Sequence, residues 1–265
     1  MRSIKKEYKA LIVDVDGTSV PYNLEALPSK KLVAAIAAAQ RKIFVGIATG
    51  RPYYDAKHII KYMGLTGPCI LNGGAQVIDA VTGRVLNAQV MIDEDVEAVC
   101  SVASDMGISL LLNTKKEDVT VRSMDKFAGQ IYGAWSNPIV DEEVADLFID
   151  RISNISTIVV HKIPSHASDK FYINIGHVKA TKLHGVLEVS RILNIKTDDI
   201  IGVGDGDNDF PLLMACGLRV AMGNAVEGLK EIADYIAPSV FEDGLVDVIE
   251  RFVLIHPINE FDDNT

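Results

Sequence analysis

Short apolar runs alternate with helical patterns at both ends of the chain. Continuous apolar runs are typical of parallel strands covered on both faces, and strand–helix alternation implies right-handed crossovers. The pattern therefore predicts an α/β fold whose core is a Rossmann-like parallel sheet. The core strands are predicted at residues 8–15, 43–48, 69–71, 199–203 and 218–221, and the helices between them at about 28–40, 53–63 and 179–193.

The middle of the chain has a different pattern, in which short strands follow one another with few helices. This pattern predicts an inserted α+β domain, so we expect a core built from residues 1–80 and 178–265 and an insertion over residues 81–177. The strands of this middle stretch are predicted at 76–79 and 84–87 as a hairpin and at 108–113, 119–122, 155–161 and 171–175, with helices over 93–106 and 141–152.

Polar residues follow three of the predicted core strands. They are Asp14-Val15-Asp16-Gly17-Thr18, Thr49-Gly50-Arg51 and the run Gly204 to Asp209. Because the carboxyl ends of parallel strands meet at one edge of a sheet, these residues are expected to lie together at a ligand site. Taken alone, Asp14 and Asp16 fit a pair of turn-capping aspartates as well as they fit two carboxylates that face one pocket. The second acidic cluster changes this, because converging carboxylates repel one another unless a cation neutralises them, and oxygen ligands suit Mg²⁺.

Charge and composition narrow the classes of partner. The formal net charge is −10 over 265 residues, so the chain lacks the basic footprint of nucleic-acid binding and repels an anionic membrane. No stretch has the length and apolarity of a signal peptide or a membrane span. The three cysteines Cys69, Cys100 and Cys216 are scattered, which favours a reducing compartment. We therefore expect a cytoplasmic protein, and the sequence leaves its oligomeric state open.

Four motifs together resemble the haloacid dehalogenase superfamily, in particular its Cof-like or type IIB capped phosphatases. The D-x-D-G-T motif matches residues 14–18, T-G-R matches 49–51, G-D-G-x-N-D matches 204–209, and A-M-G-N-A matches 221–225. The family also has a lysine about 23 residues before the aspartate of the third of these, which is Lys182 here. Leu183 stands where the family usually has glycine, and Lys179 is the competing lysine.

The resemblance implies phosphoester hydrolysis on an aspartate. Asp14 would form an aspartyl-phosphate, and Asp16 would protonate the leaving alcohol and then take a proton from water. Thr49 would hold a phosphoryl oxygen by its hydroxyl and its backbone N–H. Lys182 would neutralise both Asp14 and the phosphoryl group.

The resemblance also implies a Mg²⁺ site and a small-molecule phosphate substrate, such as a sugar phosphate or a phosphoglycolate-like acid. Asp14, the main-chain carbonyl of Asp16, and Asp205 would bind the metal, and Asp209 would orient these ligands or Lys182. Further phosphate or substrate contacts are expected at Gly50, Asn208 and Arg51. Arg51 fits a salt bridge equally well, and Asn72 fits a turn as well as it fits a substrate contact.

In this subgroup the insertion acts as a cap that closes over the active site and selects the substrate. Residues with side chains suited to contact the substrate are Arg122, Lys126, Tyr132 and Trp135.

Several alternatives remain open at this point. Phosphomutase-type transfer to a second hydroxyl uses the same motifs. A phospho-accepting signalling module also carries an aspartate, a threonine and a lysine on an α/β sheet, but the second carboxylate at Asp16 and the insertion favour an enzyme. The acidic pair Asp205 and Asp209 disfavours a dehalogenase, which needs no Mg²⁺, and the complete motif set disfavours a retired scaffold. A dinucleotide fingerprint is disfavoured because position 207 is aspartate where the motif requires glycine.

Overall fold

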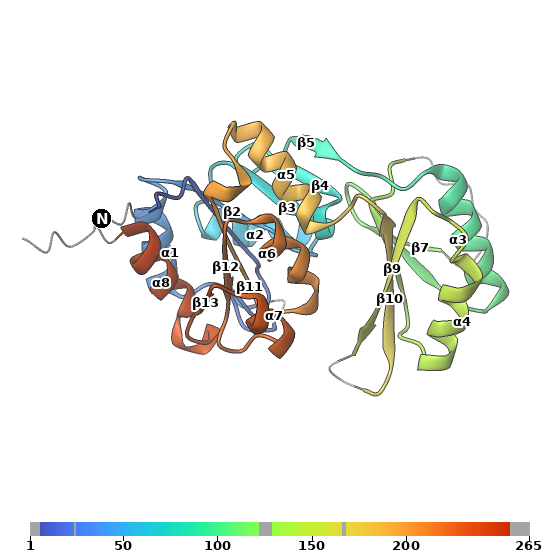
Figure 1. Ribbon diagram of the computed structural model, residues 1–265. Helices are drawn as coiled ribbons and strands as arrows, with labels where there is room; N and C mark the ends of the chain where they lie inside the picture. Colours follow the sequence, from blue (N-terminus) through green and yellow to red (C-terminus); the bar gives the residue numbers. More distant parts are fainter. Residues whose placement is uncertain (1–5, 24, 122–128, 166–167, 255–265) are drawn as a thin grey trace, which may run out of the picture.

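The computed structural model describes residues 6–23, 25–121, 129–165 and 168–254, and it has two parts, each with its own five-stranded sheet (Figure 1). The part that contains both ends of the described chain is called the core, and the part formed by α3 (Asp93–Asp105) through β10 (Phe171–His177) is called the insertion. The predicted fold class, an α/β core with an inserted α+β domain, is confirmed.

The core sheet has five parallel strands in the order β13-β12-β11-β1-β2. Strand β1 lies between β11 and β2, and all four of its residues are buried. The order places two segments far apart in the sequence side by side, because β1 pairs with both β2 and β11. The strands are β1 (Ala10–Val13), β2 (Phe44–Ile47), β11 (Ile200–Gly204), β12 (Leu218–Ala221) and β13 (Tyr235–Ile236).

Helices cover both faces of the core sheet, which explains the continuous apolar runs. Leu11 and Val13 of β1 pack into a cluster with α1, α2 and α8, whereas Ala10 and Ile12 pack on the other face with α5, α6 and α7. These helices are α1 (Lys30–Ala39), α2 (Tyr53–Tyr62), α5 (Lys182–Leu193), α6 (Phe210–Ala215), α7 (Glu227–Ile232) and α8 (Gly244–Ile249).

Strand β3 extends the core only loosely. An isolated parallel bridge joins Ala48 to Ile70, and β3 otherwise pairs antiparallel with β4 in a separate sheet of order β3-β4-β5. The predicted third parallel strand is therefore the first strand of an antiparallel sheet, because the hairpin after it folds back onto it. The bounds are β3 (Pro68–Leu71), β4 (Gln76–Asp79) and β5 (Val85–Ala88).

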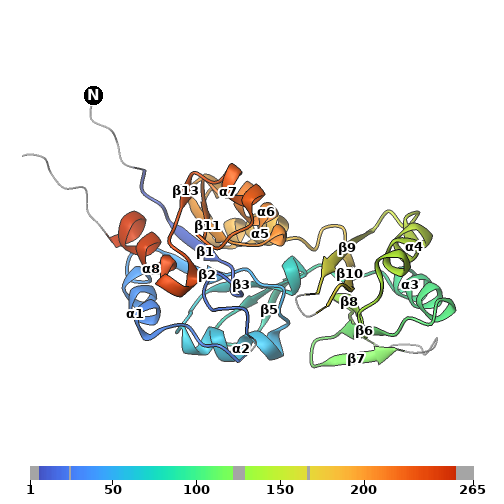
Figure 2. The ribbon, with the colours of Figure 1, turned by 90° about the horizontal axis from the view of Figure 1, so that it is seen from below.

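The insertion has an antiparallel sheet of order β7-β6-β8-β10-β9, with α3 and α4 packed on one face. Figures 1 and 2 both show these two helices on the side of the sheet that is turned away from the core. Strand β8 was not predicted, because Gly133-Ala134-Trp135-Ser136 lacks an apolar alternation, yet it lies at the centre of the sheet. The other elements are β6 (Leu110–Asn113), β7 (Asp118–Val121), β8 (Gly133–Ser136), α4 (Glu142–Ile152) and β9 (Ile158–Pro164).

None of the helices in the described ranges combines the length and apolarity needed to cross a membrane.

Candidate active site

Buried polar side chains gather where the core strands end. Asp14 directly follows β1, and Asp205 directly follows β11. All four residues of β1 pair with β11. The parallel register therefore brings the two carboxylates to one edge of the sheet, as the sequence predicted. The polar residues buried at this edge are Asp14, Thr18, Ser19, Thr49, Arg51, Lys182, Asp205 and Asp209.

Lys182 lies between two of these carboxylates. Its Nζ donates to Asp14 Oδ1 at 2.5 Å and to Asp209 Oδ1 at 2.6 Å, and its side chain is 2% exposed. Lys182 is the first residue of α5, whose N-cap is Thr181, so the helix begins three residues later than predicted. Lys179 lies before the helix, where it is exposed and donates its backbone N–H to the His177 ring. The geometry thus favours Lys182 over Lys179 as the lysine of the site.

Burial sets the electrostatics of this cluster. Desolvation and the neighbouring Asp209 raise the pKa of Asp14 well above its usual value, and Lys182 opposes that shift only in part. Burial also disfavours the charged form of Lys182, but Asp14 and Asp209 outweigh it and raise the pKa of the ammonium. The lysine therefore stays protonated, while Asp14 requires more positive charge nearby to ionise fully.

Asp209 already has protein donors on both of its oxygens. Oδ2 accepts the backbone N–H groups of Asp205 at 2.9 Å and Gly206 at 3.0 Å, and Oδ1 accepts Lys182. The side chain is fully buried. A carboxylate held in this way fixes the loop after β11 and the lysine ammonium, and its role in orienting ligands during catalysis stays a prediction.

Asp205 is held by three side chains from other loops. Thr18 donates to Oδ1 at 2.7 Å, the Tyr22 hydroxyl donates to Oδ2, and the amide of Asn224 lies 3.4 Å from Oδ2. Burial raises the pKa of Asp205 to about 6, although the hydrogen bonds from Tyr22 and Thr18 oppose the shift. No role was predicted for Tyr22 or Asn224. The A-M-G-N-A match gave a signal for Asn224, but nothing in the local pattern marked Tyr22.

The donor set fits a divalent metal ion. Asp14, Asp205 and Asp209 each offer an oxygen within 4.8 Å of the others, and all three are buried. Lys182 contributes one positive charge to these three carboxyl groups, so the cluster would carry two negative charges if all three were ionised. Buried like charges with raised pKa values are stabilised by a cation, and all-oxygen ligands suit Mg²⁺. Gly17 keeps the approach open, because a Cβ there would lie 2.2 Å from Asp205 Oδ2.

Arg51 pairs with the second carboxylate of the D-x-D motif. Its Nε donates to Asp16 Oδ2 at 2.9 Å and its Nη2 to Asp16 Oδ1 at 2.5 Å, a two-pronged contact. Arg51 is 6% exposed, whereas Asp16 is 31% exposed at the mouth of the site. Of the two interpretations offered for Arg51, the structure therefore shows the salt bridge.

The backbone around Thr49 corrects one detail of the prediction. The Thr49 N–H donates to the carbonyl of Ile70 at 2.9 Å, so it is already used to join β2 to β3. Gly50, the residue after Thr49, is exposed, and its N–H has no acceptor among the described residues. Gly50 therefore offers the backbone donor that was expected at Thr49, and the Thr49 hydroxyl remains at the site. The Asn72 amide donates to Gln76 at 2.7 Å, as a turn residue does.

The remaining predicted contacts lie farther out. Asn208 is exposed in the short 3₁₀ turn Asp207–Asp209 beside the carboxylates. Tyr132 is buried inside the insertion, where its hydroxyl donates to Gln130, so its contacts are structural. Trp135 lies on β8. Arg122 and Lys126 fall outside the described residues.

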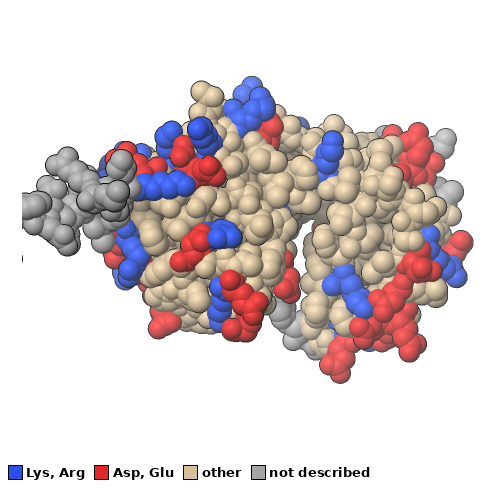
Figure 3. Space-filling model, in the orientation of Figure 1, with Lys and Arg blue, Asp and Glu red and all other residues tan. Residues whose placement is uncertain are grey.

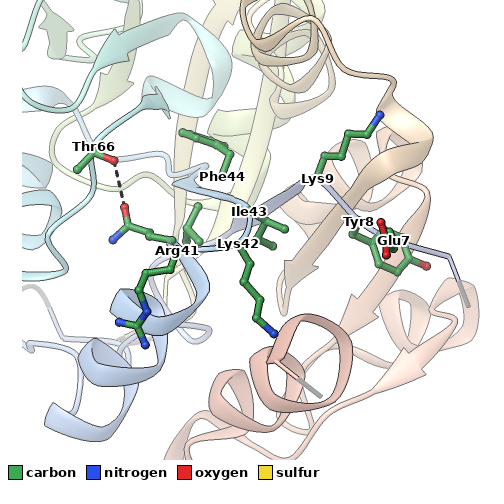
Figure 4. Close-up of a pocket in the computed structure, with 10 residues that line it drawn as sticks. Glu7, Tyr8, Lys9, Arg41, Lys42, Ile43, Phe44 and Thr66 are labelled. Atoms are coloured by element: carbon green, nitrogen blue, oxygen red, sulfur yellow. Dashed lines mark hydrogen bonds between the residues drawn. The ribbon is translucent and has the colours of Figure 1, made fainter. Parts of the chain in front are cut away.

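A hollow of about 460 Å³ lies at the opposite, amino-terminal edge of the core sheet (Figure 4). Its basic side chains point away from one another, and two of them already have acidic or carbonyl partners: Lys9 contacts Asp199 at 3.0 Å and Lys42 donates to the Leu254 carbonyl at 3.0 Å. We therefore assign the chemistry to the carboxyl edge around Asp14.

Comparisons with known proteins agree with this geometry. The family model described as haloacid dehalogenase-like hydrolase matches residues 11–249. A 5-amino-6-(5-phospho-D-ribitylamino)uracil phosphatase of Bacillus subtilis is 22% identical, covering 94% of this chain and 97% of its own. A phosphoglycolate phosphatase of Methanopyrus kandleri is 27% identical, covering 92% and 96%.

Two solved structures share the fold. A haloalkanoate-superfamily phosphatase from Bacteroides thetaiotaomicron has a TM-score of 0.81 at 22% identity, covering 96% of this chain and 98% of its own. A subclass IIB sugar phosphatase has a TM-score of 0.76 at 22% identity, covering 93% and 100%.

Proposed function

The chain belongs to the haloacid dehalogenase-like hydrolases, and on that basis we propose that it hydrolyses a small phosphate monoester through an aspartyl-phosphate on Asp14, with Mg²⁺ as cofactor. The observation that carries the proposal is the buried cluster in which Lys182 joins Asp14 to Asp209 beside Asp205. A nucleophilic carboxylate, an ammonium group and unbalanced negative charge meet there at one sheet edge.

In the first step a carboxylate oxygen of Asp14 attacks phosphorus, and the bond from phosphorus to the leaving oxygen breaks. Asp16 donates its proton to that oxygen, so the substrate leaves as a neutral alcohol. The Thr49 hydroxyl, the Gly50 N–H and Lys182 hold the phosphoryl oxygens. These donors are fixed beforehand by the fold, which is the main source of rate in phosphoryl transfer.

In the second step water attacks the phosphorus of the aspartyl-phosphate, and Asp16 takes its proton. The bond between phosphorus and Asp14 then breaks, which releases inorganic phosphate and restores both carboxyl groups. Arg51 fixes the position of the Asp16 carboxylate through its two hydrogen bonds. Asp14, the carbonyl of Asp16 and Asp205 would hold Mg²⁺, which when bound neutralises the phosphoryl oxygens and favours the ionised form of Asp14.

We further propose that residues 81–177 act as a cap over a core formed by residues 1–80 and 178–265. The insertion has its own sheet and its own hydrophobic cluster, which supports a unit that moves as one body. One contact between the two parts is the hydrogen bond from Tyr54 of α2 to Asp118 of β7. The free, buried thiols Cys69, Cys100 and Cys216 support a cytoplasmic setting.

The test is phosphate release from a panel of sugar phosphates, phosphoglycolate and other small esters with Mg²⁺. Asp14→Asn, which keeps the shape and removes the charge, should lose nearly all activity, and chelation should abolish activity reversibly. Reductive trapping of the acyl phosphate should label Asp14 in the wild type alone. Full activity in Asp14→Asn, or activity that survives exhaustive chelation, contradicts the proposal. Isomerised product without free phosphate would identify a mutase instead.

A further inference from the structure

The insertion sheet has one face packed on helices and one face turned to the core. Figures 1 and 2 both place α3 and α4 on the far side of the sheet, and Figure 3 shows a cleft between the insertion and the core. Side chains on the near face of this sheet therefore border that cleft. The alternation of side chains along each strand identifies them.

An asparagine and a tryptophan lie on the near face of the neighbouring strands β10 and β8. On β10, Ile173 and Ile175 are buried in the cluster with α3 and α4, so Asn174 between them points to the near face. On β8, Ala134 is buried in the same cluster, so Trp135 points to the near face.

The same argument places a histidine there. On β9, Val160 packs against the cluster under the helices, and Lys162 pairs with Glu142 and Asp146 of α4. His161, which lies between Val160 and Lys162, therefore points to the near face, where it is exposed.

The strand register puts these residues in one row across the sheet. Leu111 is opposite Trp135, Trp135 is opposite Asn174, and Asn174 is opposite His161. Directly opposite residues have Cβ atoms roughly 5 Å apart, so the row forms one continuous surface. Tyr172, which is 40% exposed, adds a second ring at 6.4 Å from the Trp135 ring and at 80° to it.

The polar groups of the row have no partner in the part of the chain that the structure describes. Among the described residues, none forms a hydrogen bond or an ion pair with the indole of Trp135, the amide of Asn174 or the ring of His161. Other polar side chains of this sheet are used, since Asn113 donates to Asp118 and Ser136 accepts from Ile173. Unpaired donors and acceptors beside an aromatic surface are suited to a ligand that brings its own polar groups.

The described near face also lacks positive charge. Its positions on the five strands hold no lysine or arginine, and desolvation lowers the pKa of His161, which favours the neutral form of the ring. An anionic group would gain no ion pair from these strands and would lose hydration. A neutral ring with one flat face would instead stack on Trp135 and hydrogen-bond at its rim.

We propose that Trp135, Asn174 and His161 form the subsite for the leaving group of the substrate, and that this group is an uncharged ring rich in hydrogen-bonding groups, either a sugar or a heterocycle. The inference rests on the proposed function, because it assumes that the phosphate lies at Asp14. It assigns the indole a stacking role and the other two side chains the recognition of ring substituents. It also disfavours a carboxylate leaving group such as glycolate.

The first experiment uses Trp135 as its own reporter, because it is the sole tryptophan of the chain. Indole fluorescence is recorded with Mg²⁺ and inorganic phosphate while ribose, glucose, uridine or glycolate is added. A saturable change in fluorescence with a sugar or with uridine supports the subsite and identifies whether it binds a sugar or a heterocycle. Asn174→Ala should weaken that binding about tenfold, the loss of one good hydrogen-bonded contact. Equal binding of glycolate, absence of any change, or an unaffected Asn174→Ala overturns the proposal.

The second experiment compares a ring phosphate with acetyl phosphate, which carries no ring to stack on Trp135. In Trp135→Ala the ratio of the two kcat/KM values, ring over acetyl, should fall at least about tenfold, since stacking on an aromatic ring carries that much discrimination. Tyr62→Ala, at an exposed aromatic residue at the end of α2, is the matched control and should leave the ratio unchanged. An unchanged ratio in Trp135→Ala contradicts the subsite.

The two proposals fail in different ways. A wild type that releases phosphate from acetyl phosphate but shows no preference for uncharged rings refutes the subsite alone. A wild type that releases no phosphate from any ester with Mg²⁺ refutes the proposed function.

Discussion

Replacing Lys182 by methionine removes the ammonium group that lies between two buried carboxylates. Methionine has a similar length and no charge, so the change leaves little cavity and isolates the electrostatic contribution. In the wild type the two contacts are 2.5 and 2.6 Å long, and the lysine side chain is 2% exposed. In the variant, Asp14 and Asp209 keep their burial but lose the cation that stabilises them.

The expected magnitude follows from this burial. Removing one partner of a buried ion pair costs about 3–5 kcal/mol in the free energy of unfolding, because the remaining charge is left without compensation. For a chain of this size that corresponds to a fall in Tm of roughly 6–20 °C. Activity should fall at least about 10²-fold, since the same ammonium stabilises the charge on the transferring phosphoryl group.

The loss of stability in Lys182→Met should also depend on pH, and the buried carboxyl groups determine the direction of that dependence. Burial and Asp209 raise the pKa of Asp14 above its value in the unfolded chain, and removing the lysine raises it further. The folded variant then binds a proton that the unfolded chain has released, so its stability is highest at acidic pH and falls as the pH rises. The wild type keeps its ammonium throughout this range, because the pKa of Lys182 is itself raised. The difference between the two proteins should therefore grow from about pH 5 to about pH 8.

The assay is chemical unfolding in the presence of a chelator at both pH values. Lys179→Met is the matched control, because Lys179 is exposed before the helix and should change stability by less than about 0.5 kcal/mol. Adding Asp14→Asn to Lys182→Met should restore part of the stability, since it removes one uncompensated charge. If Lys182→Met lost the same free energy of unfolding at both pH values, or if Lys179→Met lost more than Lys182→Met, the reasoning would be refuted.

Three further outcomes are expected. Arg51→Lys keeps the charge but not the two-pronged contact with Asp16. The kcat should therefore fall about tenfold for alkyl phosphates and much less for aryl phosphates, whose leaving groups need no proton, and equal losses for both would contradict a role of Arg51 in proton transfer by Asp16. Burial raises the pKa of Asp205 to about 6, so protons compete with the metal below that pH, and the rise in Tm caused by Mg²⁺ should shrink between about pH 7 and pH 5 rather than stay constant. Gly17→Ala places a side chain at a φ of +83° with its Cβ 2.2 Å from Asp205 Oδ2, so the free energy of unfolding should fall by about 1–2 kcal/mol. The Mg²⁺ affinity measured by calorimetry should also weaken, and an unaltered affinity would contradict the clash.

The sequence alone was sufficient for the fold class and for much of the candidate site. Asp14 and Asp205 were placed together because each follows an apolar strand, and the ends of parallel strands meet at one edge. The lysine was found from the spacing of about 23 residues that the family resemblance implies, although the start of α5 was placed three residues too early. Local patterns carry such features because strand period, helix caps and motif spacing are written within a few neighbouring residues.

The tertiary structure decided which groups are already occupied and which are free. Nothing near Thr49 in the sequence shows that Ile70 takes its N–H and leaves the donor of Gly50 in its place. The contact of Tyr22 with Asp205 spans 183 residues, and the pairing of Arg51 with Asp16 spans 35.

The same holds in the insertion, where strand β8 and the row through Trp135 exist only because neighbouring strands pair with them. A hydrogen bond between distant residues depends on how whole elements pack, because packing alone brings the two groups within reach. The sequence therefore determined which chemical groups reach the edge of the core sheet, and the packing of the core and the insertion determined which of them remain available to a substrate.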